Sequence, residues 1–256
     1  MRVVLGIDAA WTLHNPSGVA LAVERQAGWR FAGVWPSYAA FLGCATDPTA
    51  AALVARCDAL VGSAPDLVTV DMPLSLDPIT GRRAADRAIS SAFGARGAAT
   101  HSPSALRPGP IADRLREGFA EAGYPLRTTT RPGRLAEVYP HPALIHLMRA
   151  ERRLPYKVSR AAKYLPRLAP VPRKERLVEQ WRAILAALDV VLPGAAELLP
   201  LPKPSDPMAM LKGFEDQLDA IICAWVGTRI LDGQASAHGD DRAAIWVPDL
   251  LTPSDR

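Results

Sequence analysis

Short apolar runs separated by turn residues are the first regular feature of this chain. Val3–Ile7, Val19–Val23 and Trp29–Trp35 are rich in β-branched or aromatic residues, and Asn15-Pro16-Ser17-Gly18 is a turn signal between the first two. Strands joined by short turns usually pair in antiparallel fashion. The pattern therefore predicts a three-stranded antiparallel meander at the start of the chain.

Helical periodicity dominates the rest of the chain, and two further buried runs, Leu67–Val70 and Leu135–Tyr139, interrupt it as strands four and five. A helix capped by Asp47 or Thr49 is expected to run to about Val61. The other predicted elements are helices at Ala84–Phe93, Ile111–Ala122, His141–Arg152, Lys174–Leu188 and Gly213–Leu231, and a last edge strand at Ala243–Val247.

These elements predict an α/β protein with a single domain over residues 1–256, a length that suits one large domain. An insertion is expected at about residues 77–133, where Pro, Gly, Ser and Arg dominate. A helical extension is expected at about residues 150–210. Much of the unusually high proline content, 24 of 256 residues, lies in these segments.

The net charge of +4 hides an uneven distribution. Residues 1–81 carry 4 basic and 7 acidic side chains, residues 82–182 carry 21 and 8, and residues 183–256 carry 5 and 11. An Arg-rich middle of net charge +13 therefore lies between two acidic ends. Either this middle packs against the acidic ends, or it forms a surface that binds phosphate groups such as those of nucleic acid.

The chain lacks the signals of a membrane or secreted protein. No apolar run approaches the ~18 residues of a membrane span, and Asp8 interrupts the N-terminal run too early for a signal peptide. Cys44, Cys57 and Cys223 are odd in number and have no CxxC spacing, so neither disulfides nor a zinc site is expected. We expect a cytoplasmic protein without membrane contact, and the sequence leaves its oligomeric state open.

Carboxylates at strand ends and on the last helix are the strongest functional signal. Asp8 closes the first strand, Asp71 follows the fourth and Glu137 lies in the fifth. Asp216 and Asp219 are three residues apart and share one face of the last helix. Buried carboxylates are costly unless they are paired or bind a cation. Convergent oxygen ligands suit Mg²⁺ or Mn²⁺, and two such ions about 4 Å apart can promote phosphodiester cleavage.

Each of these acids also has a structural interpretation. Asp8 could end its strand or pair with an arginine, and Glu137 could take an arginine partner from the basic insertion. Glu215 is interpreted as a solvated acid in the first turn of the last helix. Arg83 and Asp86 could form an i,i+3 ion pair. The sequence leaves these alternatives open.

Several short strings together resemble one known family. Gly6-Ile7-Asp8-Ala9-Ala10-Trp11-Thr12, followed by Ser17-Gly18-Val19-Ala20, resembles the first hairpin of the ribonuclease-H-like fold. The pattern is completed by Val70-Asp71-Met72-Pro73-Leu74, Arg83 with Asp86, Glu137-Val138-Tyr139-Pro140, Tyr156-Lys157 and Asp219-Ala220-Ile221. From about Val3 to Leu231 the chain is similar to the domain of unknown function 429 family, described as predicted nucleases of the ribonuclease H fold.

The resemblance implies a ribonuclease-H-like three-layer fold. Its mixed five-stranded sheet would have helices on both faces and a helical, Arg-rich insertion between strands four and five. The resemblance also implies metal-binding roles for Asp8, Asp71 and Asp219, with Asp216 or Glu137 as a fourth ligand. Candidates for phosphate binding are Arg83 and Lys157, which match the family strings, together with Thr12 and Lys163.

Together these features predict a Mg²⁺- or Mn²⁺-dependent nuclease that hydrolyses phosphodiester bonds in nucleic acid. Asp8, Asp71, Asp219 and Glu137 would form its catalytic group, and water would be the nucleophile. Two alternatives remain at this point. One is a non-catalytic nucleic-acid-binding module of the same fold, and the other is an enzyme acting on a small phosphorylated metabolite.

Overall fold

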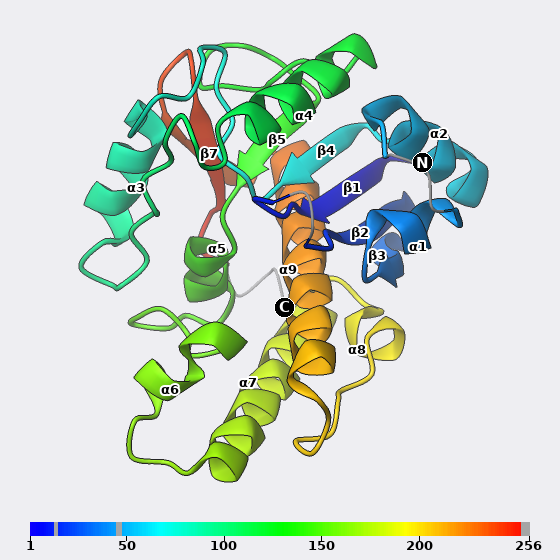
Figure 1. The fold of residues 1–256 in the computed structure, drawn as a ribbon. Coiled ribbons are helices and arrows are strands. Elements are labelled where there is room, and N and C mark those ends of the chain that lie inside the picture. The colour runs from blue at the N-terminus through cyan, green and yellow to red at the C-terminus, as the bar shows by residue number, and fades with distance from the viewer. Residues whose placement is uncertain (13–14, 45–47, 252–256) are drawn as a thin grey trace.

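A seven-stranded mixed sheet forms the centre of the protein, in the order β3-β2-β1-β4-β5-β7-β6 (Figure 1). The computed structural model describes residues 1–12, 15–44 and 48–251, so the predicted cap Asp47 lies outside the described residues. The strands are β1 Val3–Asp8, β2 Gly18–Arg25, β3 Gly28–Trp35, β4 Leu67–Val70, β5 Leu135–Val138, β6 Ala235–Gly239 and β7 Ala244–Pro248.

The pairing of the strands confirms the N-terminal meander and corrects the size of the sheet. β1, β2 and β3 pair in antiparallel fashion, whereas β1, β4, β5 and β7 are parallel neighbours. The five-stranded prediction is wrong, because β7 and its antiparallel partner β6 extend the sheet beyond β5. β7 is therefore an inner strand. The pattern missed β6 because its sequence, Ala-Ser-Ala-His-Gly, contains no large or β-branched apolar residue.

Helices surround this sheet, most of them close to their predicted positions. They are α1 Tyr38–Leu42, α2 Ala50–Val61, α3 Ala84–Phe93, α4 Pro110–Glu121, α5 Pro140–Leu147, α6 Ala161–Tyr164, α7 Pro170–Val191, α8 Ala195–Leu198 and α9 Met208–Leu231, with a 3-10 turn at Val158–Arg160. α2 begins as expected, since Thr49 Oγ1 accepts a hydrogen bond from Ala52 N at 3.1 Å. Within the described residues, none of these helices has the length and hydropathy that a membrane span requires.

The helix predicted over His141–Arg152 ends early, at Leu147. Arg149 adopts a left-handed backbone conformation with φ of 49°, which a continuing helix does not allow. The carbonyl of Ala150 instead accepts a hydrogen bond from the Arg96 guanidinium at 2.6 Å. The chain thus leaves the helical path where it contacts Arg96 of the insertion, and the local sequence pattern does not reveal this contact.

The two faces of the sheet pack against different helices. Val3, Leu5 and Ile7 contribute to a core with α1, α2 and α4, whereas Val4 faces a core with α5, α7 and α9. This alternation along β1 is expected for a strand that is buried on both faces. Figure 1 shows α9 crossing the sheet at β1 and β4 and extending beyond it beside α7. The predicted α/β class with helices on both faces is therefore confirmed.

Glycines let α9 lie directly on the sheet. A Cβ atom added to Gly6 would be only 2.3 Å from Ala224 N and 2.5 Å from Ala220 O. A Cβ atom on Gly18 would be 2.2 Å from Asp216 O. Since real side chains do not tolerate such distances, Gly6 and Gly18 are required for this close packing. The same packing brings the acidic turns of α9 to the ends of β1 and β2.

Candidate functional site

Asp8 and Asp71 lie next to each other at the carboxyl ends of two parallel strands. β1 and β4 pair Ile7 with Val70, and Asp71 N donates a hydrogen bond to Ile7 O at 2.9 Å. Asp8 directly follows Ile7, and Asp71 directly follows Val70, so the two aspartates are also neighbours across the strands. Both side chains are partly exposed. Carboxyl ends of neighbouring strands are a common place for ligands in α/β sheets.

Asp219 joins this pair from α9. Gly18, whose backbone lies against Asp216, is also the register partner of Asp8 on β2. The turn of α9 that contains Asp216 and Asp219 therefore lies over the end of β1. Asp219 is fully buried. Asp8, Asp71 and Asp219 come from positions far apart in the sequence, and the fold brings them together.

Both carboxylate oxygens of Asp219 have partners. Oδ1 accepts a hydrogen bond from Tyr156 OH at 2.7 Å, and Oδ2 is ion-paired with Lys157 Nζ. Lys157 Nζ also lies 3.5 Å from Oε1 of Glu215, which is buried one helical turn earlier on α9. Lys212 Nζ donates to Glu215 at 3.0 Å and to Asp216. Two lysines thus neutralise the acids of α9.

The acids at the strand ends, by contrast, have no such partners. In the described part of the chain, no side-chain or backbone donor lies within hydrogen-bonding distance of the Asp8 or Asp71 carboxylate. Burial raises the pKa of Asp8 well above its usual range, and the charges of Asp219 and Asp71 raise it further, while Lys157 opposes them. Burial likewise raises the pKa of Asp71 to about 7 against the effect of Lys157. This open pair, free of protein donors among the described residues, is where a cation would be bound most favourably.

As the side chains stand, no three His, Cys, Asp or Glu residues among those described are arranged to hold a metal ion. The reason is visible in the contacts, because Asp219 is held by Tyr156 and Lys157 and points its oxygens at them. The donor set that remains is the two-carboxylate pair Asp8 and Asp71. This pair suits Mg²⁺ or Mn²⁺, since such ions are often held by one or two carboxylates with water and phosphate completing the shell.

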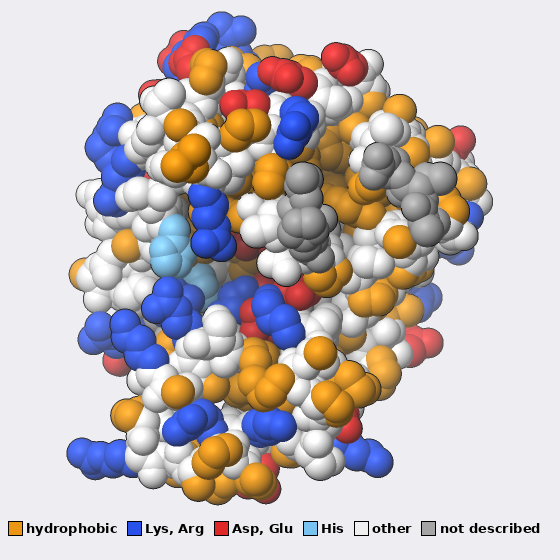
Figure 2. Space-filling view, in the orientation of Figure 1, with side chains coloured by type: hydrophobic (Ala, Val, Ile, Leu, Met, Phe, Trp, Pro, Cys, Tyr) orange, Lys and Arg blue, Asp and Glu red, His pale blue; other side chains and the backbone are white. Residues whose placement is uncertain are grey.

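Three arginines lie close enough to His101 to act on its pKa. Burial lowers the pKa of His101, and the nearby charges of Arg160, Arg153 and Arg107 lower it further. We call these three arginines the arginine rim. Arg153 and Arg160 also lie near His141, whose ring packs against Tyr156 beside the site at 5.3 Å between centroids. Figure 2 shows acidic side chains in the middle of this face, with Lys, Arg and His side chains around them.

The matching family model spans residues 6–244 and is described as "Protein of unknown function (DUF429)". The chain belongs to the DUF429 family. The match starts within β1 and ends at the first residue of β7, so it includes Asp8, Asp71 and Asp219. Neither a curated protein nor a solved structure matches the chain. The function of this DUF429 protein must therefore be argued from its own site.

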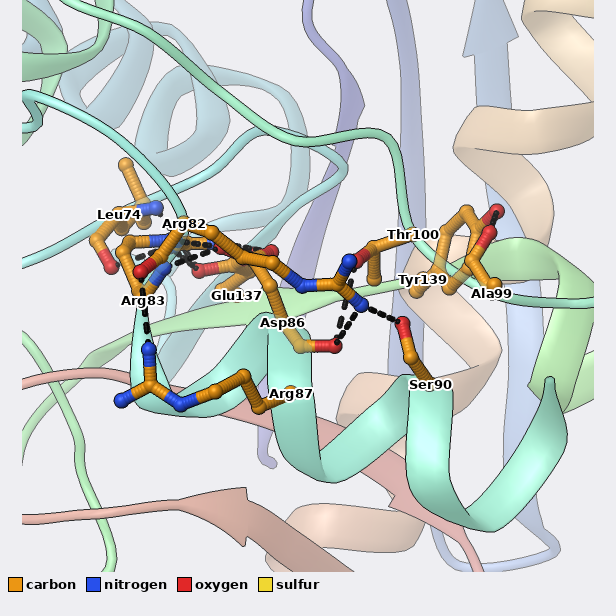
Figure 3. A network of polar contacts seen from close by, with 10 residues as sticks. All are labelled: Leu74, Arg82, Arg83, Asp86, Arg87, Ser90, Ala99, Thr100, Glu137 and Tyr139. Carbon is orange, nitrogen blue, oxygen red and sulfur yellow. Dashed lines mark hydrogen bonds and ion pairs between the residues drawn. The ribbon is translucent and has the colours of Figure 1, made fainter.

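Glu137 and Arg83 lie apart from the open acids, in a buried network that Figure 3 shows. Arg83 donates to both oxygens of Glu137, at 2.5 and 2.8 Å, and to both oxygens of Asp86, at 3.0 and 2.9 Å. Burial raises the pKa of Glu137 to about 7, and without Arg83 it would be higher still. Both structural interpretations of these residues, an arginine partner for Glu137 and an Arg83–Asp86 pair, match the contacts.

The remaining predicted residues of the DUF429 site are placed as follows. Asp216 is buried and paired with Lys212. Thr12 follows β1, and its hydroxyl accepts a hydrogen bond from Asn15 N at 3.3 Å. Lys163 is exposed on α6, and Lys157 is engaged by carboxylates. Arg83 and Lys157 are thus paired with carboxylates, whereas no described acidic residue forms an ion pair with Lys163.

Sequence reasoning missed the roles of Tyr156, Lys212 and Glu215 at this site. The solvated first-turn interpretation of Glu215 is wrong, because α9 begins at Met208 and Glu215 is only 1 % exposed. One signal was present in the sequence: Lys212, Glu215, Asp216 and Asp219 are spaced i, i+3, i+4 and i+7, which places them along one face. A mixed-charge face on an otherwise apolar helix indicates a buried charge cluster.

The pKa of Asp71 leads to a stability prediction for this DUF429 protein. Burial raises the pKa of Asp71 in the folded protein to about 7, so its protonated form stabilises the fold below about pH 4 and this contribution is lost as the pH rises through 7. Relative to the wild type, Asp71→Asn should therefore gain on the order of 1–2 kcal/mol of stability between about pH 4.5 and 7.5, after allowance for solvent screening.

Urea unfolding of the wild type and of Asp71→Asn at about pH 4.5 and at about pH 7.5 measures this difference in stability. Asp58→Asn, at an exposed position on α2, is the matched control and should show no such pH-dependent gain. A difference between Asp71→Asn and wild type that stays constant with pH would contradict the raised pKa of Asp71.

Proposed function

We propose that this protein is a divalent-metal-dependent nuclease that hydrolyses phosphodiester bonds in nucleic acid. The observation that carries the proposal is the pair of partly exposed carboxylates, Asp8 and Asp71, which lie side by side without donors among the described residues. Two unneutralised carboxylates repel each other, and a bound cation relieves that repulsion. The lysine-bound acids of α9 lie beside them.

The arrangement of the sheet supports a ribonuclease-H-like core. Strands β3-β2-β1-β4-β5, antiparallel in the first half and parallel in the second, form a five-stranded mixed part of the sheet, which is consistent with the mixed sheet that the resemblance implies. α9 lies across β1 and carries Asp219. In this proposal β7 and β6 are an extension of that core. A fold alone does not define an activity, so the carboxylates are the main support for this function.

Asp8 and Asp71 would hold one Mg²⁺ or Mn²⁺. A bound ion of this kind supplies positive charge to a phosphate oxygen and makes water a better nucleophile. The reaction adds water across one phosphorus–oxygen ester bond: the water oxygen bonds to phosphorus, that ester bond breaks, and the leaving oxygen takes up a proton. Asp8 and Asp71 would fix the position of the ion at the strand ends, and buried Asp219 holds Lys157 beside that position.

The arginine rim supports a nucleic-acid substrate. The charges of Arg107, Arg153 and Arg160 all act on His101, and guanidinium groups match phosphate oxygens in geometry and charge. Arg107 also lies over the ring of Trp11, with 5.9 Å between guanidinium and ring centroid. Trp11 follows β1, so this contact joins the basic insertion to the acidic strand end. A polyanion could therefore contact the rim and the carboxylates at once.

A cleavage assay tests the proposal. The full-length protein should cleave at least one labelled substrate among single-stranded, duplex, hybrid and branched nucleic acids when Mg²⁺ or Mn²⁺ is present, and EDTA should stop the reaction. Asp8→Asn should reduce the rate by about 100-fold or more, because several kcal/mol of charge stabilisation depend on the cation. Asp58→Asn removes an exposed acid of α2 and should keep the wild-type rate.

Two results would overturn this function. Salt-dependent binding of nucleic acid without any turnover would instead indicate a binding module. Cleavage that Asp8→Asn leaves unchanged would show that the activity does not come from this site.

A further inference from the structure

Lys157 is a fixed cation rather than a mobile surface lysine. The residue before it, Tyr156, is fully buried, and its carbonyl accepts a hydrogen bond from Trp181 Nε1 on α7 at 2.8 Å. The residue after it, Val158, donates its backbone N–H to Glu215 Oε2 at 2.5 Å. The backbone on both sides of Lys157 is thus tied to α7 and to α9. The side chain is 17 % exposed, so its ammonium group is largely enclosed by the site.

The ammonium group of Lys157 takes the place that a metal ion would need. It is ion-paired with Asp219 Oδ2 and lies 3.5 Å from Glu215 Oε1. The remaining oxygen of Asp219 accepts from Tyr156 OH, and Glu215 also accepts from Lys212. Every carboxylate oxygen of Asp219 and Glu215 therefore has a donor from the protein. Asp8 and Asp71, by contrast, have no donor among the described residues and are open to an added cation.

We propose that the site takes one divalent cation, at Asp8 and Asp71, and that Lys157 serves as its second cation, at Asp219 and Glu215. This inference rests on the proposed function and deepens it. A protein ammonium of charge +1 replaces an ion of charge +2, so the site carries less positive charge than a two-metal centre. The fixed position of the lysine compensates for this in part, because a preorganised charge needs no reorganisation when the substrate binds.

The number of Mn²⁺ ions bound per chain tests the inference. Titration of the full-length wild-type protein, followed by electron paramagnetic resonance, should show one tightly bound Mn²⁺ without spin coupling to a second. Lys157→Gln frees Oδ2 of Asp219 and leaves Lys212 as the one lysine at Glu215 Oε1, and it should raise the number to two and introduce coupling between neighbouring ions. Lys203→Gln changes an exposed lysine between α8 and α9 and should keep one ion.

The outcomes separate this inference from the proposed function. A wild-type protein that binds two coupled Mn²⁺ ions overturns the role of Lys157 but leaves a metal-dependent nuclease. A wild-type protein that binds no Mn²⁺ overturns the proposed metal site itself. A Lys157→Gln protein with a wild-type circular dichroism spectrum and a single Mn²⁺ also overturns the role of Lys157. The wild-type count is decisive even where Lys157→Gln fails to fold.

Discussion

Replacing Arg83 with methionine will lower the free energy of unfolding by about 3–5 kcal/mol, because it leaves two buried carboxylates without their cation. The guanidinium is 7 % exposed and lies between Glu137 and Asp86, which are 4 % and 1 % exposed (Figure 3). Methionine has a similar length and keeps most of the packing, so the loss reports mainly on charge. Urea unfolding followed by circular dichroism measures it.

Two further variants test whether the loss of stability comes from the missing charge of Arg83. Arg87→Met removes an exposed arginine from the same helix, α3, and should change the stability by no more than about 0.5 kcal/mol. Adding Glu137→Gln to Arg83→Met removes one of the uncompensated charges and should restore part of the loss. An Arg83→Met protein within about 1 kcal/mol of wild type would show that the network does not carry the charge balance assigned to it.

The same network holds the chain that follows Asp71. Leu74 N donates to Glu137 at 2.8 Å, and Leu74 O accepts from Arg83 at 2.6 Å. Leu74 is three residues beyond Asp71, so the loop leaving β4 is held at both its N–H and its carbonyl by the network. Glu137 and Arg83 therefore act as positioning residues for the strand end at which Asp71 lies. This is a different role from the catalytic and phosphate-binding ones predicted from the sequence.

The second large effect is expected from Gly6→Ala, which should destabilise the protein by about 3 kcal/mol by overpacking. The added methyl group would lie 2.3 Å from Ala224 N and 2.5 Å from Ala220 O, and both are backbone atoms that cannot rotate away. α9 would have to move off β1. Because Asp8 and Asp219 are held together by this packing, we also expect the cleavage rate to fall.

Gly213→Ala is the matched control, since it adds the same methyl group to α9 at a position with no neighbour within 4 Å. It should stabilise the protein by about 0.5–1 kcal/mol, because alanine favours helix over glycine. The melting temperatures of the wild type, Gly6→Ala and Gly213→Ala, measured by thermal unfolding, give the comparison. Equal melting temperatures for Gly6→Ala and wild type would mean that α9 does not lie on β1 as closely as described.

Much of the fold could be predicted from local sequence features. α3 was predicted with its observed bounds, because Asp86 at its third position caps Arg83 N and Ala85, Ile89 and Phe93 form its buried face. The meander was predictable because strands and turns alternate over few residues. β6 was not, since its place in the sheet depends on β7, which pairs with β5 more than a hundred residues earlier.

The candidate site, too, could be predicted only in part from the sequence. Asp8 and Asp71 could be placed at strand ends from the sequence, because each follows a buried apolar run directly. Asp219 could be placed on the last helix, although not over the end of β1. The residue types and their positions along each element therefore follow from local patterns of burial and charge, which nearby residues set.

Tertiary structure decided which charge neutralises which acid. Lys157 is 62 residues from Asp219, and Arg83 is 54 residues from Glu137, yet each pair is in direct contact. The chain holds 30 basic residues, and nothing in the local pattern selects among them. Only the packing of the Val158–Arg160 turn against α9, and of α3 against β6 and β7, brings these partners within ion-pair distance. The sequence contains the acids of the site, whereas the fold leaves Asp8 and Asp71 open and gives Asp219 and Glu137 their cations.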